Sequence, residues 1–415
     1  MRRKLVHSGF RFFLKLFKYT LTINPPNIFA MKSYLTFEQG PIRPPSEAHS
    51  LLIRTTRGCS WNKCRFCSAY NSQKFSIRTV AEIINDIRII KEISDQVREI
   101  SHEIGCEGRV TSEVIRQISV FHGGNSSYMN VAMWLYRGTG DCFLQDGDNL
   151  IMKTEHLVKV LSFLRETLPE VGRITTYSRS KTISLKTVEQ LREIKEAGLD
   201  RVHVGLESGC DTVLEHVKKG ATKEVHVDAG RKAIAAGMEL SVYVIPGLGG
   251  VRLSARHAME TADVINRINP HFIRLRSLRV PERIPLFKDL QDGTFERPSD
   301  DLVIQEIRCL IENLKGISST LTSDHILNIL GDVQGIFPED KSKMLKIIDE
   351  YEALPAEEKL IFRLGRRGGA YQSISDLYNN KATRSKISSM LQDVREKGGA
   401  SAVEDLINKM ADELS

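Results

Sequence analysis

The residues with the most evident chemistry are three cysteines in the stretch "RTTRGCSWNKCRFCSAYN", residues 54–71. Cys59, Cys64 and Cys67 have the spacing C-x4-C-x2-C, with Phe66 directly before the last of them. Thiolates bind zinc or iron. A structural zinc site takes four ligands, usually as two separated pairs, and this sequence has no second C-x2-C. Three thiolates therefore suit a [4Fe–4S] cluster with one iron left open to a substrate or a cofactor.

The remaining cysteines are scattered along the chain, and we expect them to be ordinary buried thiols. They are Cys106, Cys142, Cys210 and Cys309. The sequence predicts a cytoplasmic protein. In such a reducing compartment, a cysteine cluster indicates metal binding more than disulfides. The alternative for the triplet is a structural zinc site in a binding protein without catalysis, and the metal content of the purified protein distinguishes the two.

After residue 50, short buried-strand patterns alternate with segments at helical spacing. Strands are predicted within residues 51–56, 141–149, 172–179, 200–209, 238–250 and 271–278. Helices are predicted between them, the first from about Val80 to Ile93. Successive β-then-α units imply parallel strands, and active sites of such barrels lie at the carboxyl ends of the strands. The predicted fold class is α/β, a partial (β/α)6 TIM-like barrel with a helical C-terminal extension.

Three regions are predicted along the chain. Residues 1–47 are a basic N-terminal segment and lead-in, residues 48–285 form the barrel with an insertion at about 94–140, and residues 286–415 form the mainly helical extension. No apolar run approaches the ~18 residues needed to span a bilayer.

The first thirty residues carry most of the net charge. They hold six basic residues and no acidic one, so removing these charges from the net +7 leaves a nearly neutral body with +1. A phosphate-binding surface for nucleic acid therefore does not follow from composition. Read as a helix, "RRKLVHSGFRFFLKLFKYTL" is amphipathic and could contact a membrane surface. The alternatives are a helix packed on the body, or translation that begins at Met31; its basic residues interrupt the apolar run a signal peptide needs.

From about residue 48 to 280 the chain resembles the radical S-adenosylmethionine (radical SAM) enzymes. Their usual triplet is C-x3-C-x2-C with an aromatic residue before the last cysteine; this chain keeps the aromatic residue, Phe66, and has one more residue between Cys59 and Cys64. The resemblance implies that the three cysteines hold a [4Fe–4S] cluster whose open iron binds the amino and carboxylate groups of SAM. It also implies reductive cleavage of SAM to methionine and a 5′-deoxyadenosyl radical that abstracts hydrogen from a substrate, with a reductant such as flavodoxin or ferredoxin.

Two later loops resemble the family's segments for the amino group and the ribose of SAM. "QDGD" takes the place of a Gly-Gly-Glu-like turn, where Asp146 or Asp148 would accept a hydrogen bond from the amino group. "GLESG" resembles the ribose-binding segment, with Glu207 and Ser208 as candidates. A carboxylate there accepts hydrogen bonds from ribose hydroxyls. Taken singly, the aspartates could be turn residues and Glu207 could pair with a nearby Lys or Arg.

"VIPGLGG" resembles the adenine-contacting loop of the family, where Gly247 and Gly249 allow close approach of the backbone. The alternative is that these glycines serve the strand–loop geometry alone. Four loops in order around one barrel, led by the cysteine triplet, carry the resemblance together.

The substrate is less readable than the chemistry. The series "GLESG…VKKGAT…YVIPGLGG" resembles the branch with oxygen-independent coproporphyrinogen oxidases and methylthiotransferases, but the flanking regions do not match those enzymes. We expect a small or medium-sized metabolite as the substrate. The alternative is a tRNA, which the nearly neutral body disfavours.

"TLTSDHILNIL", residues 320–330, follows the barrel and a long predicted helix. Thr322, Ser323 or Asp324 is predicted to cap a helix over "HILNIL", with His325 in its first turn. A C-terminal segment often closes the open side of the barrel in radical SAM enzymes, so His325 could face the radical and handle a substrate proton or carboxylate. The alternative is a surface or packing role for His325.

Overall fold

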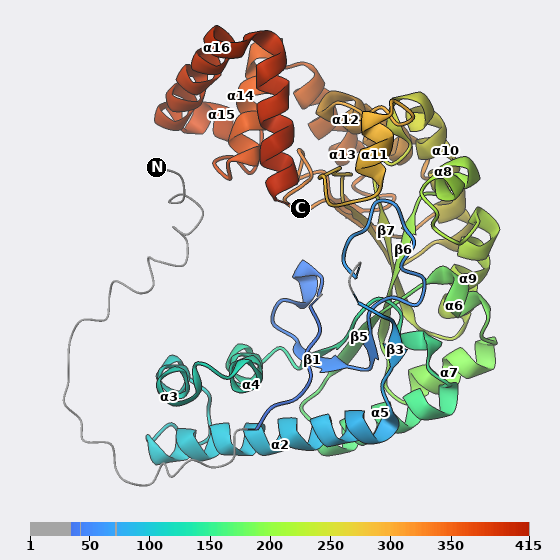
Figure 1. Ribbon diagram of the computed structural model, residues 1–415, viewed down its shortest axis with the longest axis vertical. Coiled ribbons are helices and arrows are strands. Elements are labelled where there is room, and N and C mark those ends of the chain that lie inside the picture. The colour runs from blue at the N-terminus through green and yellow to red at the C-terminus, as the bar shows by residue number, and fades with distance from the viewer. Residues whose placement is uncertain (1–34, 42, 71–72, 415) are drawn as a thin grey trace. The chain divides into compact units, whose positions relative to one another are not determined.

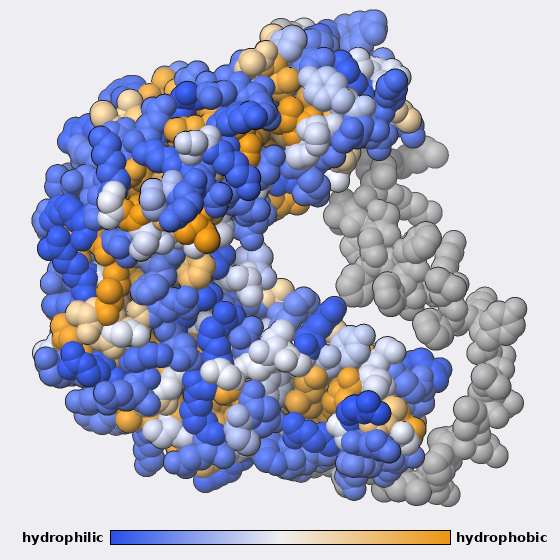
Figure 2. Space-filling view, turned by 180° about the vertical axis from the view of Figure 1, so that it is seen from behind, coloured by the Kyte–Doolittle hydropathy of each residue, from blue (hydrophilic) through white to orange (hydrophobic). Residues whose placement is uncertain are grey.

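The computed structural model describes residues 35–41, 43–70 and 73–414. Thr36–Ser415 forms one unit, and its described part is considered by itself. The basic N-terminal helix and the start at Met31 lie outside the described residues. Within the described part, no helix is long and apolar enough to cross a membrane. Figure 2 shows hydrophilic side chains over most of the visible face of the molecule, with hydrophobic ones in smaller patches.

An eight-stranded sheet is the main β structure of the described unit (Figure 1). In spatial order its strands are β1 (Leu51–Arg54), β4 (Asp141–Gln145), β5 (Arg173–Ser178), β6 (Arg201–Glu207), β7 (Glu239–Val244), β8 (Phe272–Leu275), β9 (Thr320–Thr322) and β10 (Gly335–Ile336). Neighbours from β1 to β9 pair in parallel, and β10 pairs antiparallel with β9. The six predicted strands are confirmed, and their order is that of a partial TIM-like barrel.

Helices follow the parallel strands and cover one face of the sheet (Figure 1). They are α5 (Thr154–Thr167), α6 (Ser180–Ser184), α7 (Val188–Glu196), α8 (Asp211–His216), α9 (Lys223–Ala235) and α10 (Gly250–Ile268). Beneath them, alternate strand residues are apolar and buried, such as Val202 and Val204 on β6 and Leu240 and Val242 on β7. Because side chains alternate along a strand, the residues between them face the opposite side of the sheet.

The segment after β1 holds a longer helix than predicted. Helix α2 (Val80–Glu103) continues ten residues beyond Ile93, starting from a capping box of Thr79 and Glu82. Its buried apolar stripe extends through Val97, so the predicted end at Ile93 is wrong. Two further helices follow, α3 (Ser112–His122) and α4 (Ser126–Arg137).

The C-terminal region is mainly helical, as predicted. Its helices are α11 (Leu286–Gln291), α12 (Asp300–Asn313), α13 (Lys341–Glu352), α14 (Ala356–Arg367), α15 (Asp376–Asn379) and α16 (Lys381–Glu413). Strands β9 and β10 interrupt this series and extend the sheet beyond β8.

The helix predicted over "HILNIL" is wrong: the chain forms irregular turns after β9. The buried side chain of Asn328 takes the place of helical hydrogen bonds. Its Nδ2 donates to the carbonyl oxygens of Leu275 (2.8 Å) and Ser323 (3.1 Å), and its Oδ1 accepts from the backbone N–H of Ser277 (2.9 Å). The segment is therefore fixed to the end of β8.

Candidate active site

The cysteine loop starts from a short hairpin directly after β1. Strands β2 (Thr56–Arg57) and β3 (Ser76–Ile77) bring the two ends of the loop together, and Gly58 turns into it at φ +84°, a conformation that favours glycine. The N–H of Gly147, after β4, donates to the carbonyl of Gly58 (3.2 Å), and the N–H of Arg65 donates to the carbonyl of Val217, after β6 (2.9 Å). The loop therefore lies at the carboxyl ends of the strands, as predicted.

The three thiols of this loop are partly buried and interact electrostatically with one another. Burial raises the pKa of Cys64 to about 11, against the charge of Lys219, which lowers it; burial also raises the pKa of Cys67. A methyl group on Gly147 would lie 3.2 Å from Cys59 Cβ and 3.5 Å from its Sγ, so this glycine leaves space beside the first thiol.

Three clustered thiols on a backbone held from both sides are a donor set that fits an iron–sulfur cluster. In the described part of the chain, no group of three or more His, Cys, Asp or Glu side chains is positioned so that it could hold a metal ion. The assignment of the cysteines to a cluster therefore depends on their chemistry and position.

A buried ion pair lies beside the cysteine loop. Lys219 Nζ is 3.0 Å from Glu207 Oε1 and 5.8 Å from the centre of the Phe66 ring. Glu207 has φ +66° at the end of β6, and a methyl group on Gly205 would lie 2.1 Å from Glu207 Oε1, so glycine leaves room for this carboxylate. The structure thus shows the lysine pairing considered for Glu207, and a bond from Oε2 to ribose stays a prediction. Lys219 is not among the residues predicted from the sequence, because a lysine in a polar loop gives no signal of burial.

The two candidate aspartates after β4 are both buried and differ in their partners. Asp146 pairs with Arg54, whose Nε lies 2.6 Å from Oδ2, while its Oδ1 is buried without a hydrogen-bond partner in the described chain. Asp148 is saturated on both oxygens. It accepts hydrogen bonds from the hydroxyls of Ser60, Ser178 and Thr182 and from the N–H of Arg179. Asp146 therefore has one buried oxygen with no hydrogen bond, near the hydroxyl of Tyr70, and its contact with the amino group of SAM stays a prediction; Asp148 organises the surrounding loops.

The remaining predicted SAM-binding residues are involved in loop geometry. Ser208 is buried, and its hydroxyl accepts a hydrogen bond from the N–H of Cys210 (3.0 Å). Gly247 has φ +89° after β7, and Gly249 precedes the first residue of α10. The glycine geometry considered for this loop is present, and contact of its backbone with adenine stays a prediction.

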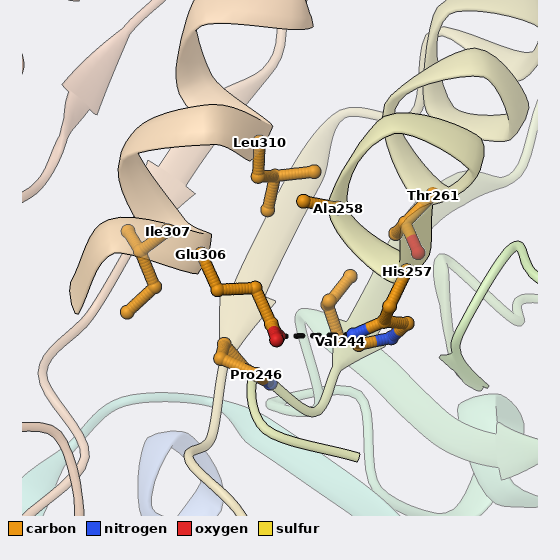
Figure 3. Close-up of a pocket in the computed structure, with 8 residues that line it drawn as sticks. All are labelled: Val244, Pro246, His257, Ala258, Thr261, Glu306, Ile307 and Leu310. Atoms are coloured by element: carbon orange, nitrogen blue, oxygen red, sulfur yellow. Dashed lines mark hydrogen bonds and ion pairs between the residues drawn. The ribbon is translucent and has the colours of Figure 1, made fainter. Parts of the chain in front are cut away.

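A buried carboxylate behind these loops, that of Glu306, points toward His257 (Figure 3). Glu306 on α12 accepts hydrogen bonds from the N–H of Gly247 (2.6 Å) and the hydroxyl of Ser254 (2.6 Å). Its Oε1 also lies 2.9 Å from Nδ1 of His257 on α10. Sequence reasoning misses Glu306 and His257, because a helical Glu or His gives no sign of burial when its partner is on another helix.

Helix α10 also fixes the loop after β6. Nε2 of His257 lies 3.4 Å from the carbonyl oxygen of Glu207, and the N–H of Gly209 donates to the hydroxyl of Thr261 (2.9 Å). The two loops predicted to contact ribose and adenine are therefore bound to one helical support.

His325 lies partly buried in the segment after β9. Burial and the nearby charge of Arg276 lower its pKa to about 4, so the imidazole is neutral at pH 7. Its Nδ1 accepts a hydrogen bond from the N–H of Leu327 (3.2 Å), which places the ring proton on Nε2. A catalytic role for His325 stays a prediction.

The fold and the site define an α/β partial-barrel enzyme with its functional loops at the carboxyl ends of the strands. Residues 128–262 match the radical SAM superfamily. The match extends from α4 into α10 and includes the loops after β4, β6 and β7, whereas the cysteine loop precedes it. A match to this superfamily implies a [4Fe–4S] cluster and SAM as cofactors, and a reductant.

Several solved structures are similar to this chain at low identity. The radical SAM methyltransferase TsrM from Kitasatospora setae, with tryptophan and a SAM analogue bound, is 15% identical over 58% of this chain and 38% of its own, with a TM-score of 0.40. The cobalamin-dependent radical SAM enzyme OxsB is 13% identical over 88% of this chain and 53% of its own, with a TM-score of 0.42. Methylornithine synthase is 15% identical over 66% of this chain and 64% of its own, with a TM-score of 0.40.

The chain thus spans less than two thirds of the length of each of these proteins. A comparison with curated proteins found no match.

Proposed function

We propose that this protein cleaves SAM reductively and abstracts hydrogen from a small or medium-sized metabolite. The observation that carries the proposal is the loop with Cys59, Cys64 and Cys67 at the carboxyl ends of the strands, hydrogen-bonded to the loops after β4 and β6. The bound cluster and SAM would supply the electron transfer and the 5′-deoxyadenosyl radical.

The chain's own residues would bind and orient SAM. Asp146 Oδ1 is a free buried acceptor for the amino group, and Glu207 Oε2 is an acceptor for the ribose, its other oxygen being paired with Lys219. The backbone of the loop at Gly247 and Gly249 would contact the adenine. Phe66 would shield the last cysteine from water, since its ring packs against the buried cluster of Cys210, Val213, Val217, Ile245 and Leu248.

His325 is the candidate for handling a substrate proton in this proposal. Since its Nε2 carries the proton in the neutral ring, it would donate a hydrogen bond to a substrate oxygen. We expect flavodoxin or ferredoxin as the reductant. The resemblance to the coproporphyrinogen oxidase and methylthiotransferase branch remains a prediction, as does the cytoplasmic location.

The test is an anaerobic reconstitution of the full chain with iron and sulfide. We expect about four irons with sulfide per chain, and methionine with 5′-deoxyadenosine after addition of SAM and dithionite. Stoichiometric zinc without sulfide would instead indicate the binding protein without catalysis. A tRNA that co-purifies with the protein would favour the tRNA-modifying alternative.

A further inference from the structure

The inner face of the sheet, opposite the helices, is apolar at Leu52, Phe143 and Phe272 and carries polar side chains over its middle strands. On β5, β6 and β7 it carries the rings of Tyr177, His203 and Tyr243, whose centroids lie 5.4 to 6.1 Å from one another. Thr175, Ser241, Arg274 and Thr322 share this face by the register of the strands. Closed TIM barrels fill the same position with branched apolar side chains. A polar lining indicates a polar ligand inside this partial barrel.

Most charges on the inner face are neutralised near the amino ends of the strands. Arg173 lies 3.0 Å from Asp141, and Arg201 lies 2.6 Å from Glu239. Towards the carboxyl end of β8 the pattern changes. Arg274 donates to the hydroxyl of Ser241 (3.1 Å) and lies over the ring of Phe272, and among the described residues neither it nor Arg276 forms an ion pair with a carboxylate.

Arg276 is fixed by its backbone and free at its side chain. Its N–H donates to the carbonyl of Val244 (3.0 Å). The residues on either side, Leu275 and Ser277, are both hydrogen-bonded to the buried amide of Asn328. The side chain of Arg276 is exposed beyond the end of β8. The backbone therefore fixes where the arginine starts, and its guanidinium group has no carboxylate to give up when it binds an anion.

Further hydrogen-bond donors surround Arg276. Its charge acts on His325, Tyr177 and Tyr243, so all three lie within its electrostatic reach. Neutral His325 offers its Nε2 proton, and since the hydroxyls of Tyr177 and Tyr243 interact with each other, this pair has one O–H left to donate. The carboxylate of Asp324 also interacts with His325, but it is exposed and forms no ion pair with either arginine among the described residues.

We propose that Arg276 and Arg274 bind an anionic group of the substrate, a carboxylate or a phosphate, at the mouth of the barrel. The two guanidinium groups lie two residues apart on the same strand face, and each presents a planar fork that matches a carboxylate or a phosphate. The inference rests on the proposed function, because the two arginines would bind the substrate of that reaction through its anionic group. It narrows the substrate class to anionic metabolites.

Calorimetric titrations of the full chain with sodium phosphate, sodium succinate and uncharged glycerol test the proposal. We expect phosphate or succinate to bind more tightly than glycerol, and Arg276→Gln to weaken that binding by about tenfold or more. Arg276→Lys keeps the charge and loses the fork, so its affinity should lie between those of the wild type and Arg276→Gln. Arg252→Gln, an exposed arginine on α10, is the matched control and should bind as the wild type does.

The choice of probe identifies the anion, because preference for phosphate indicates a phosphate ester and preference for succinate a carboxylate. Equal binding of all three probes by the wild type, or unchanged anion binding by Arg276→Gln, would overturn the proposal. The same titrations on protein prepared without iron test the anion site independently of SAM cleavage. Anion binding that depends on Arg276 while the reconstituted protein fails to cleave SAM would keep the anion site and reject the proposed function.

Discussion

At the scale of single residues, substitutions of cysteine distinguish the thiols that would bind the cluster from the ordinary ones. Cys64→Ala should lose iron and the formation of 5′-deoxyadenosine, because three thiolates are the minimum set for the cluster. Cys309→Ala should keep both, since this cysteine lies on α12, far along the chain from the loop. Iron analysis and chromatography of the SAM products measure the two effects. Normal SAM cleavage by Cys64→Ala would contradict the cluster assignment.

Gly205 gives a second prediction at this scale. An added methyl group would lie 2.1 Å from Glu207 Oε1, so Gly205→Ala must displace the carboxylate that pairs with Lys219. Iron content should stay at the wild-type level, while SAM affinity should fall by roughly ten- to a hundredfold, as expected for a lost hydrogen bond to a charged group. Gly124→Ala is the control, because nothing lies within 4 Å of its added methyl. Calorimetry with equal affinities in both variants would remove Glu207 from the SAM site.

At the scale of elements, helix α12 holds the loop after β7 in place through Glu306. Glu306→Gln replaces charge-assisted hydrogen bonds to Gly247 and Ser254 by neutral ones, a loss of about 1 kcal/mol. The amide of Gly247 should then exchange its hydrogen about fivefold to tenfold faster in cofactor-free protein, and SAM affinity should fall in the reconstituted protein. Glu312→Gln, exposed on the same helix, should change neither. An unchanged amide in Glu306→Gln would show that the hydrogen bond does not hold the loop.

Sequence patterns were sufficient to predict some of these elements and not others. The six strands from β1 to β8 in the main sheet were predictable because each is an apolar run in a series that alternates with helical patterns. The short β9 and β10 were not, since three and two residues give no period to read. The turn segment with His325 was read as a helix because "TSD" resembles a cap, whereas the deciding contact is the hydrogen bond from the side chain of Asn328 to Leu275 at the end of β8.

For the candidate site, the sequence placed the cysteine loop and the later loops at one edge of the barrel, which the strand order confirms. It did not reveal Lys219, His257 or Glu306, because their partners come from other elements. Such contacts depend on tertiary packing, and propensity and spacing carry no information about them.

At the scale of the whole molecule, a buried charge cluster joins the C-terminal helices to the barrel. Asp300 on α12 is surrounded by Arg279, after β8, and by Arg363 and Arg367 on α14. Burial alone would raise the pKa of Asp300, but the three guanidinium groups hold it well below its usual range. Breaking a buried ion pair by removing one partner typically costs about 3–5 kcal/mol. Asp300→Asn should therefore lower the free energy of unfolding at pH 7 by about this amount, since it leaves Arg279 and Arg367 without their carboxylate, whereas Arg363 keeps Glu404.

The pH dependence of this loss follows from the direction of the pKa shift. A carboxyl whose pKa is lower in the folded protein stabilises it fully above the unfolded value, about pH 4, and the contribution disappears as pH falls through the folded pKa. The stability difference between the wild type and Asp300→Asn should thus be largest at neutral pH and should shrink as the pH falls well below 4. Urea unfolding across this range measures it, with the exposed Asp349→Asn as a control that should cost no more than about 1 kcal/mol. A difference that stayed constant with pH would mean that Asp300 contributes packing and not charge, and that the C-terminal helices are held to the barrel by other contacts.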